Sequence, residues 1–233
     1  HYMDEFAEAH AKAMVVRDWL GAGIPSAGVG CAIARDRLAI LDTRSERRGP
    51  FDADSLTEDY ELGLRVAEAG AKVAFLRVRG SDGRLVATRA FFPRRLETAV
   101  RQKTRWVCGI ALQGWDRMGW SGGIIDGWMR LRDRRGPMAA LVLFAAYLLL
   151  ILSAVLLVAQ HLGLARSLAL TPLIGTLLVT NAVSLVWRSA FRGIFTAREY
   201  GAEEGVRAVL RIPLSNFIAI LAGRRAVVQY VAS

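Results

Sequence analysis

Cysteine and histidine are scarce in this chain of 233 residues, which contains two cysteines and three histidines. Cys31 and Cys108 lie far apart and form no CxxC pair, and the histidines are scattered along the chain. Because no cluster has the spacing of metal ligands, we predict no metal site in this chain. We expect both thiols to be reduced, as is usual for a domain on the cytoplasmic side of a membrane.

Charge is absent from two long stretches of the chain. Residues 138–159 form a run of 22 residues without a charged side chain, and residues 168–187 form a second run of 20. At about 1.5 Å of rise per residue, either run can cross a hydrocarbon core of roughly 30 Å as a helix. Two buried core helices are the alternative, but uncharged runs of this length favour a transmembrane hairpin.

A signal peptide is also absent, because both runs lie far from the N-terminus. The chain begins with His1 rather than methionine and enters directly into a helical pattern, so we expect the C-terminal part of a longer protein. Arginines flank the hairpin on both sides: Arg130, Arg132, Arg134 and Arg135 precede it, and Arg188, Arg192 and Arg198 follow it. The positive-inside rule therefore predicts that both ends of the hairpin are cytoplasmic.

Signals for nucleic-acid binding are missing despite a formal net charge of +10. The chain shows no helix-turn-helix pattern, no RNA-binding signature and no aromatic platform among its arginines. The positive charge therefore favours anionic lipid and a phosphate-bearing substrate as partners, and no nucleic acid.

The segment before the hairpin mixes helical and strand patterns. Apolar residues step by three and four along residues 4–20, and Glu8 and Lys12 form an i,i+4 pair. Residues 55–70 read as a helix with a Ser55–Glu58 capping box and a glycine stop. The remaining expected elements are a loop and short buried strand at 21–34, a short helix and polar loop at 35–55, strands at 71–78 and 84–90, and a long helix at 93–115.

The segments on either side of the hairpin are amphipathic. Residues 119–137 combine glycines, tryptophans and arginines, a composition typical of a segment lying at a membrane interface. Residues 206–211 and 214–225 carry apolar stripes separated by Pro213, which predicts two helices with a break between them. These helices either lie on the cytoplasmic membrane surface or dock against the soluble domain, and the sequence leaves both possibilities open.

Three short motifs occur in order before the first uncharged run: "PSAGVG" (25–30), "TED" (57–59) and "QKTRW" (102–106). Each has an ordinary structural explanation when taken alone. Glycine-rich stretches are usually turns, acidic residues favour the first turn of a helix, and a tryptophan on a helix usually packs in a core. Their order, followed directly by membrane spans, carries more information than any one of them.

This order resembles that of the processive family 2 glycosyltransferases, the group that includes cellulose synthase and hyaluronan synthase. Those enzymes carry D, DxD, [ST]ED and QxxRW motifs followed by a membrane-surface segment and membrane helices. The stretches "DEFAEAHAKAMVVRDWL", "PSAGVGCAIAR" and "RQKTRWVCGIALQGW" are similar to the branch of phage adsorption protein B-like inner-membrane glycosyltransferases. The resemblance implies an inverting transferase in the bacterial inner membrane that uses a nucleotide sugar and a saccharide acceptor. An outer-membrane or export partner is a further expectation from this branch.

The resemblance also implies a fold and its division along the chain. The fold expected is α/β with added membrane helices. Residues 1–118 would be the C-terminal half of a GT-A-like catalytic domain, and residues 119–137 a membrane-interface segment. Residues 138–187 would be the transmembrane hairpin, and residues 188–233 cytoplasmic amphipathic helices.

The resemblance assigns roles that agree with the chemistry of sugar transfer. Asp59 matches the general base, which deprotonates the acceptor hydroxyl as it attacks the anomeric carbon. Gln102 and Arg105 offer donors for the departing diphosphate, and Trp106 offers a flat face for a sugar ring. The remaining residues expected to contact the acceptor are Glu58 and the loop glycines Gly28 and Gly30, which let it approach the backbone.

One departure from the family pattern is informative. The first aspartate and the DxD pair, which hold the nucleotide and its metal in this family, have no counterpart before residue 57. Asp52 and Asp54 spell DxD but lie too close to the TED motif, so we interpret them as part of a polar loop. We therefore expect Mg²⁺ or Mn²⁺ to be bound by ligands outside this chain, and this chain alone to be inactive. The alternative function is a membrane scaffold or receptor-complex subunit with a degenerate transferase domain.

Overall fold

The computed structural model describes residues 1–44, 55–88, 90–166 and 171–232. The first helical stretch consists of α1 (Tyr2–Glu8), a π-helical segment η1 (Ala9–Ala13) and α2 (Met14–Trp19). It confirms the helix predicted at 4–20, including the Glu8–Lys12 ion pair and the end at Gly21, which has a φ of +69°. The π-helical segment was not predicted.

The short strand predicted within 21–34 and the strands predicted at 71–78 and 84–90 are wrong for the residues that the structure describes, which contain no strand. A single antiparallel bridge joins Arg79 to Leu85. Residues 71–78 are extended and alternate between half-buried and exposed side chains, as a strand would. However, the backbone N–H of Phe75 donates to the Asp18 side chain at 3.0 Å instead of to a neighbouring strand. The α/β character expected for the fold is therefore not confirmed, because a strand requires a partner for its backbone groups.

Helix α3 (Arg35–Arg44) confirms the short helix predicted after the glycine loop, and α4 (Glu58–Glu68) confirms the helix of the TED motif. The capping box predicted for α4 does not form. Thr57 occupies the N-cap without a side-chain cap bond, and Ser55 Oγ accepts from the Thr57 N–H at 3.2 Å and donates to Glu61 at 2.8 Å. The helix begins two residues later than a Ser55 cap requires, so Glu58 lies at the first helical position rather than the third.

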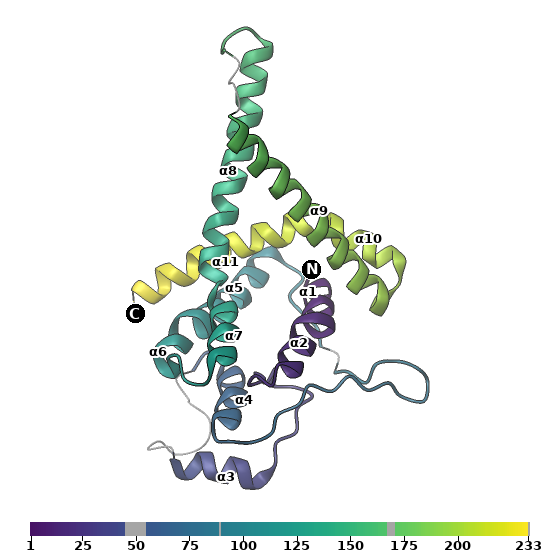
Figure 1. The fold of residues 1–233 in the computed structure, drawn as a ribbon, viewed down its shortest axis with the longest axis vertical. Coiled ribbons are helices and arrows are strands. Elements are labelled where there is room, and N and C mark those ends of the chain that lie inside the picture. Colours follow the sequence, from purple (N-terminus) through teal and green to yellow (C-terminus); the bar gives the residue numbers. More distant parts are fainter. Residues whose placement is uncertain (45–54, 89, 167–170, 233) are drawn as a thin grey trace.

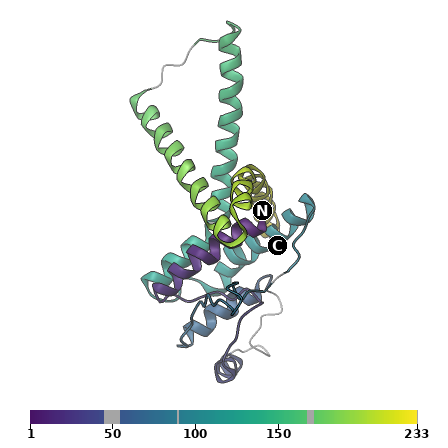
Figure 2. The same cartoon turned by 90° about the vertical axis from the view of Figure 1, so that its right-hand side faces the viewer.

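The long helix predicted at 93–115 is present as three consecutive segments: α5 (Leu96–Val107), the π-helical η2 (Cys108–Gln113) and α6 (Gly114–Met118). Helix α7 (Ile124–Arg134) follows. Helices α8 (Gly136–His161) and α9 (Pro172–Tyr200) then project from the body of the molecule (Figures 1 and 2). Both are long and apolar enough to cross a membrane, and the most apolar part of each is unburied, which agrees with the predicted hairpin.

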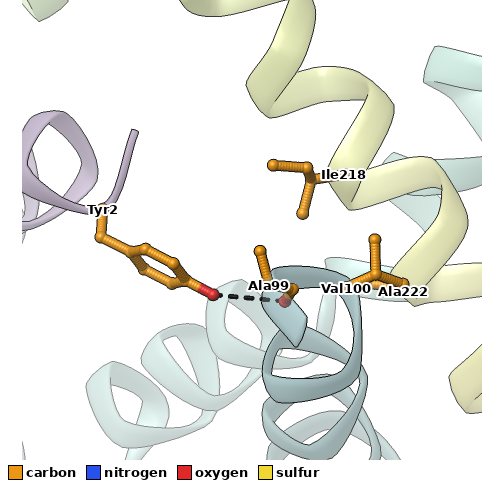
Figure 3. Close-up of a cluster of buried hydrophobic side chains, with 5 residues drawn as sticks. All are labelled: Tyr2, Ala99, Val100, Ile218 and Ala222. Atoms are coloured by element: carbon orange, nitrogen blue, oxygen red, sulfur yellow. Dashed lines mark hydrogen bonds between the residues drawn. The ribbon is translucent and has the colours of Figure 1, made fainter. Parts of the chain in front are cut away.

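The last two helices, α10 (Ala202–Leu210) and α11 (Ile212–Val231), confirm the predicted break, which falls at Arg211, and are bent by 49°. Pro213 lies in the first turn of α11. One face of α11 docks against the body: Ile218 and Ala222 pack with Ala99 and Val100 of α5 (Figure 3). The Tyr2 hydroxyl donates to the Ala99 carbonyl at 3.2 Å in the same cluster. The other face carries exposed apolar side chains, including Leu214, Phe217, Val228 and Val231. One face of α11 therefore docks against the body of the molecule. Contact with the membrane surface remains an expectation for its exposed face.

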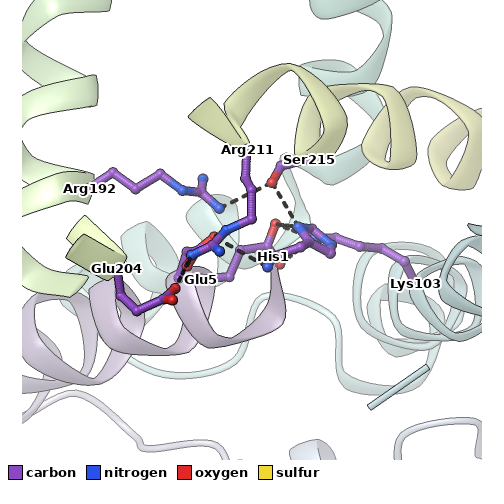
Figure 4. A network of polar contacts seen from close by, with 8 residues as sticks. His1, Glu5, Lys103, Arg192, Glu204, Arg211 and Ser215 are labelled. Atoms are coloured by element: carbon purple, nitrogen blue, oxygen red, sulfur yellow. Dashed lines mark hydrogen bonds and ion pairs between the residues drawn. The ribbon is translucent and has the colours of Figure 1, made fainter. Parts of the chain in front are cut away.

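A polar network ties the first and last helices to the helix that carries the QKTRW motif (Figure 4). Lys103 of α5 forms an ion pair with Glu5 of α1. Arg211, between α10 and α11, binds the fully buried Asp4 at 2.7 Å and Glu204 at 2.9 Å. Ion pairs and buried contacts therefore hold the motif helix against α1 and α11.

Candidate functional site

A small cavity opens beside the first turn of α4. Its volume is about 270 Å³, and its lining combines the glycine loop, α3 and α4: Ser26, Gly28, Cys31, Ile33, Leu38, Asp59 and Leu62. Asp59 is the only carboxylate among these lining residues. The structure therefore brings together two of the residues singled out in the sequence, Asp59 and Gly28, although 31 positions separate them.

Gly28 lies directly against the Asp59 carboxylate. Its φ of +72° lies in the left-handed region that favours glycine, and a Cβ at this position would be 2.9 Å from Asp59 Oδ2. The other carboxylate oxygen, Oδ1, accepts from the Tyr60 N–H at 2.8 Å. One oxygen of Asp59 is thus held by the start of α4, and the other faces the glycine loop.

The glycine loop reaches α4 because of a second glycine, which the sequence analysis missed. A Cβ on Gly63 would lie 2.3 Å from the Ser26 nitrogen and 2.5 Å from the Ile24 oxygen. Any side chain at this position would push the loop away from the helix. A glycine inside a helical pattern was the available signal, since it lowers helix propensity without a local structural reason.

Buried polar contacts fix α4 to its neighbours. The Tyr60 hydroxyl donates to Asp133 of α7 at 2.7 Å, and Arg17 of α2 binds the same Asp133 oxygen at 2.7 Å. Burial, and next the Asp133 charge, raise the pKa of Tyr60, so its hydroxyl stays protonated as a donor. Glu61, which is 2% exposed, receives hydrogen bonds from Ser55 and Arg117. These contacts orient the helix that carries Asp59.

The TED motif contacts the continuous helical stretch α5–η2–α6, which carries the QKTRW motif, at Gly109. Gly109 lies one turn beyond Arg105. A Cβ on Gly109 would lie 2.6 Å from Thr57 Oγ1. Arg105 is exposed, and no hydrogen bond or ion pair joins it to another residue within the described ranges. Gln102 is partly buried, and its Oε1 atom is buried without a hydrogen-bond partner in the same part of the chain. Both side chains therefore retain hydrogen-bonding groups that no described residue satisfies.

Five of the predicted site residues lie outside the lining of this cavity: Gln102 and Arg105, described above, and Trp106, Gly30 and Glu58. The Trp106 ring packs edge-on against Tyr2 and Phe6, with centroid separations of 5.8 and 6.2 Å, beside the cluster that α11 covers. Gly30 faces Thr88, where a Cβ would lie 3.4 Å from Cγ2. Glu58 is exposed at the first position of α4. Trp106 is thus partly buried against a core cluster and does not line the cavity.

Metal ligands do not cluster in the part of the chain that the structure describes, where no group of three or more histidine, cysteine or acidic side chains could hold an ion. Asp52 and Asp54, interpreted above as a polar loop, lie outside the described residues. A larger cavity of about 560 Å³ lies at the other end of α4, beside Leu64, Ala67 and Glu68. It contains none of the motif residues, so the smaller cavity at Asp59 is the candidate site.

Comparison with known proteins agrees with the motif order. The family model of glycosyl transferase family group 2 matches residues 1–187. Bacteriophage adsorption protein B of Escherichia coli K12 and bacteriophage N4 adsorption protein B of Escherichia coli O157:H7 are each 34% identical over 249 residues. The alignments cover 98% of this chain and 33% of each relative, so the chain spans about a third of their length. No solved structure matches. The chain belongs to glycosyl transferase family group 2.

Proposed function

We propose that this chain carries the base and the leaving-group contacts of a membrane-bound, inverting glycosyltransferase. The observation that carries the proposal is the position of Asp59, whose carboxylate reaches a cavity lined by the glycine loop. A general base must have a free oxygen within reach of the acceptor hydroxyl. Oδ2 of Asp59, which accepts no hydrogen bond from the described residues, supports this role. Inversion is proposed because the residues that line the cavity include one carboxylate, which suits a base and leaves no second carboxylate to act as a covalent nucleophile.

The donor is proposed to be a nucleotide sugar, with a uridine diphosphate as leaving group. Arg105 is an exposed guanidinium without a partner among the described residues, and its planar fork suits a diphosphate, while Gln102 adds an amide beside it. A divalent ion such as Mg²⁺ or Mn²⁺ would neutralise part of the diphosphate charge, and we propose that residues outside this chain hold it. We place the enzyme in the bacterial inner membrane with Asp59 on the cytoplasmic side, where nucleotide sugars occur.

The direct test is Asp59→Asn in the complete gene product that contains this chain, purified in detergent or nanodiscs. Loss of a general base lowers the transfer rate by about 10²–10⁴-fold. We expect that loss together with nucleotide-sugar binding that stays within a few fold of wild type. Asp36→Asn is the matched control, because Asp36 is an exposed aspartate on α3 outside the cavity lining. Unchanged transfer by Asp59→Asn would contradict the assignment.

A second function is favoured by the names of the two relatives, both of which refer to bacteriophage adsorption. In this alternative the chain belongs to a membrane scaffold or receptor-complex subunit, with an outer-membrane or export partner and a degenerate transferase domain. The same variant separates the two proposals. Phage adsorption that survives Asp59→Asn, in cells where transfer is lost, would assign adsorption to the scaffold and not to the sugar product.

A further inference from the structure

The rod formed by α5, η2 and α6 leaves α-helical geometry immediately after the QKTRW motif. Its π-helical segment η2 begins at Cys108, and Gly109, the second residue of η2, is buried against the first residue of the TED motif. Segments of π-helix are rare and are often found at functional sites. The TED motif therefore meets the rod at a defined backbone contact, three residues beyond the QKTRW motif.

Only a glycine fits this contact. A Cβ on Gly109 would lie 2.6 Å from Thr57 Oγ1, 2.7 Å from Thr57 Cγ2 and 3.1 Å from Thr57 Cβ. Thr57 cannot swing away easily, because it is 4% exposed. Its Oγ1 is buried without a hydrogen-bond partner among the described residues, so Thr57 occupies this position for its shape and not for a polar contact. The φ of Gly109 is not positive, so an alanine here would meet no backbone strain.

The contact between Gly109 and Thr57 determines how closely the start of α4 packs against the rod. Thr57 is the N-cap of α4, and Asp59 follows it by two residues. Arg105 precedes Gly109 by one helical turn. Displacement of Thr57 by an added methyl group would therefore move the Asp59 carboxylate relative to Arg105, and both ends of the proposed reaction would lose their alignment.

We propose that Gly109 is a positioning residue for sugar transfer, which sets the separation between the base on α4 and the diphosphate-binding face of α5 through its contact with Thr57. This inference rests on the proposed function. Gly109 itself touches no reacting atom. Its effect passes through Thr57, so removal of the Thr57 side chain should relieve the effect of a methyl group at position 109.

The experiment uses four variants of the complete gene product: Gly109→Ala, Thr57→Ala, and the pairs Gly109→Ala/Thr57→Ala and Gly109→Ala/Thr57→Ser. A misplacement of about 1 Å can lower a rate by about 100-fold, so we expect Gly109→Ala to lower kcat by about 10- to 100-fold with little change in the donor KM. The pair with Thr57→Ala should regain most of this loss, since only the Thr57 Cβ, at 3.1 Å, remains near the new methyl group. The pair with Thr57→Ser should stay impaired, because Oγ1 remains at 2.6 Å.

Gly127→Ala is the matched control, since Gly127 is also helical and a Cβ placed on it would have nothing within 4 Å. Thermal unfolding of each variant separates activity from folding. If Gly109→Ala does not fold, the folded pair with Thr57→Ala decides by its kcat. Full activity of Gly109→Ala while Asp59→Asn is inactive would overturn this inference alone. Absence of transfer in the wild-type protein would overturn the proposed function and this inference together.

Discussion

Gly28 and Asp59 lie so close that any side chain at position 28 would meet the carboxylate, since a Cβ there would be 2.9 Å from Oδ2. We predict that Gly28→Ala lowers sugar transfer strongly, because the methyl group displaces the proposed base. The positive φ of +72° adds about 1–2 kcal/mol of backbone strain to any such substitution.

The variant Gly21→Ala separates the effect of the contact with Asp59 from the effect of the backbone strain. Gly21 has a similar φ of +69°, but nothing lies within 4 Å of a Cβ on it. Both variants should lose similar stability in thermal unfolding, whereas only Gly28→Ala should lose transfer in an assay of kcat. A loss of transfer of the same size in both variants would assign the effect to backbone conformation, and full transfer in both would contradict the prediction.

The sequence predicted the parts of this structure that depend on local signals. Length and lack of charge identify α8 and α9, and a helical stripe identifies the stretch from α1 to α2, because both signals lie within a single segment. The extended segment 71–78 has the alternation of a strand, with Phe75 half-buried and Leu76 exposed, yet it has no ladder partner in the part of the chain described. Strand pairing depends on distant residues, which a pattern within one segment does not reveal.

The candidate site also combines features that sequence signals predicted with features that depend on distant residues. The order of the motifs predicted that the glycine loop and Asp59 belong to one site, and the structure places Gly28 and Asp59 around one cavity. A glycine ordinarily weakens a helix, yet Gly63 and Gly109 are each the point where another segment contacts a helix backbone. Contacts of this kind depend on the tertiary fold, so the sequence identifies the glycine but not the segment it meets.

Trp106 is predicted to stabilise the fold through its packing. Its ring lies edge-on to Tyr2 and Phe6 and packs against the cluster that contains Ile218. Replacement of a buried tryptophan by alanine costs about 3–5 kcal/mol, and we expect about 2–3 kcal/mol for Trp106→Ala because the ring is only partly buried. The unfolding free energy measured in detergent checks this value.

Two further substitutions show whether Trp106 also contacts the acceptor. Trp19 is 82% exposed, so Trp19→Ala should change stability by less than about 0.5 kcal/mol. Trp106→Phe keeps an aromatic ring in the cluster and should retain most of the stability. A raised acceptor KM in a stable Trp106→Phe protein would support the acceptor role, and an unchanged KM would leave packing as the role of this side chain.

The orientation of the hairpin can be tested with one native and one added cysteine. Cys31 is exposed and belongs to the part proposed to be cytoplasmic, whereas Cys108 is buried. Leu164, which is 79% exposed, lies in the loop between α8 and α9. In spheroplasts, whose outer membrane is removed and whose inner membrane is intact, an impermeant maleimide should label Leu164→Cys in a Cys31→Ser background. It should label native Cys31 only after permeabilisation, and labelling of Cys31 from outside would reverse the orientation.

Acid is predicted to destabilise the fold through His10. Its ring lies 5.5 Å from Phe6 and 5.7 Å from Phe75, and burial, followed by the charge of Arg77, lowers its pKa below the ordinary histidine value of 6.5. As the pH falls through 6.5, the unfolded chain binds a proton that the native chain does not yet bind, so the free energy of unfolding decreases down to the lower native pKa. Between about pH 7.5 and about pH 5.5, which bracket the ordinary histidine pKa, the wild-type protein should lose more stability than His10→Gln.

His161→Gln, in an exposed position at the end of α8, is the control and should follow the wild type in the same thermal unfolding experiment. Parallel losses in His10→Gln and the wild type would assign the acid sensitivity to other groups, such as Glu204, whose pKa is lowered by its hydrogen bond from Arg211.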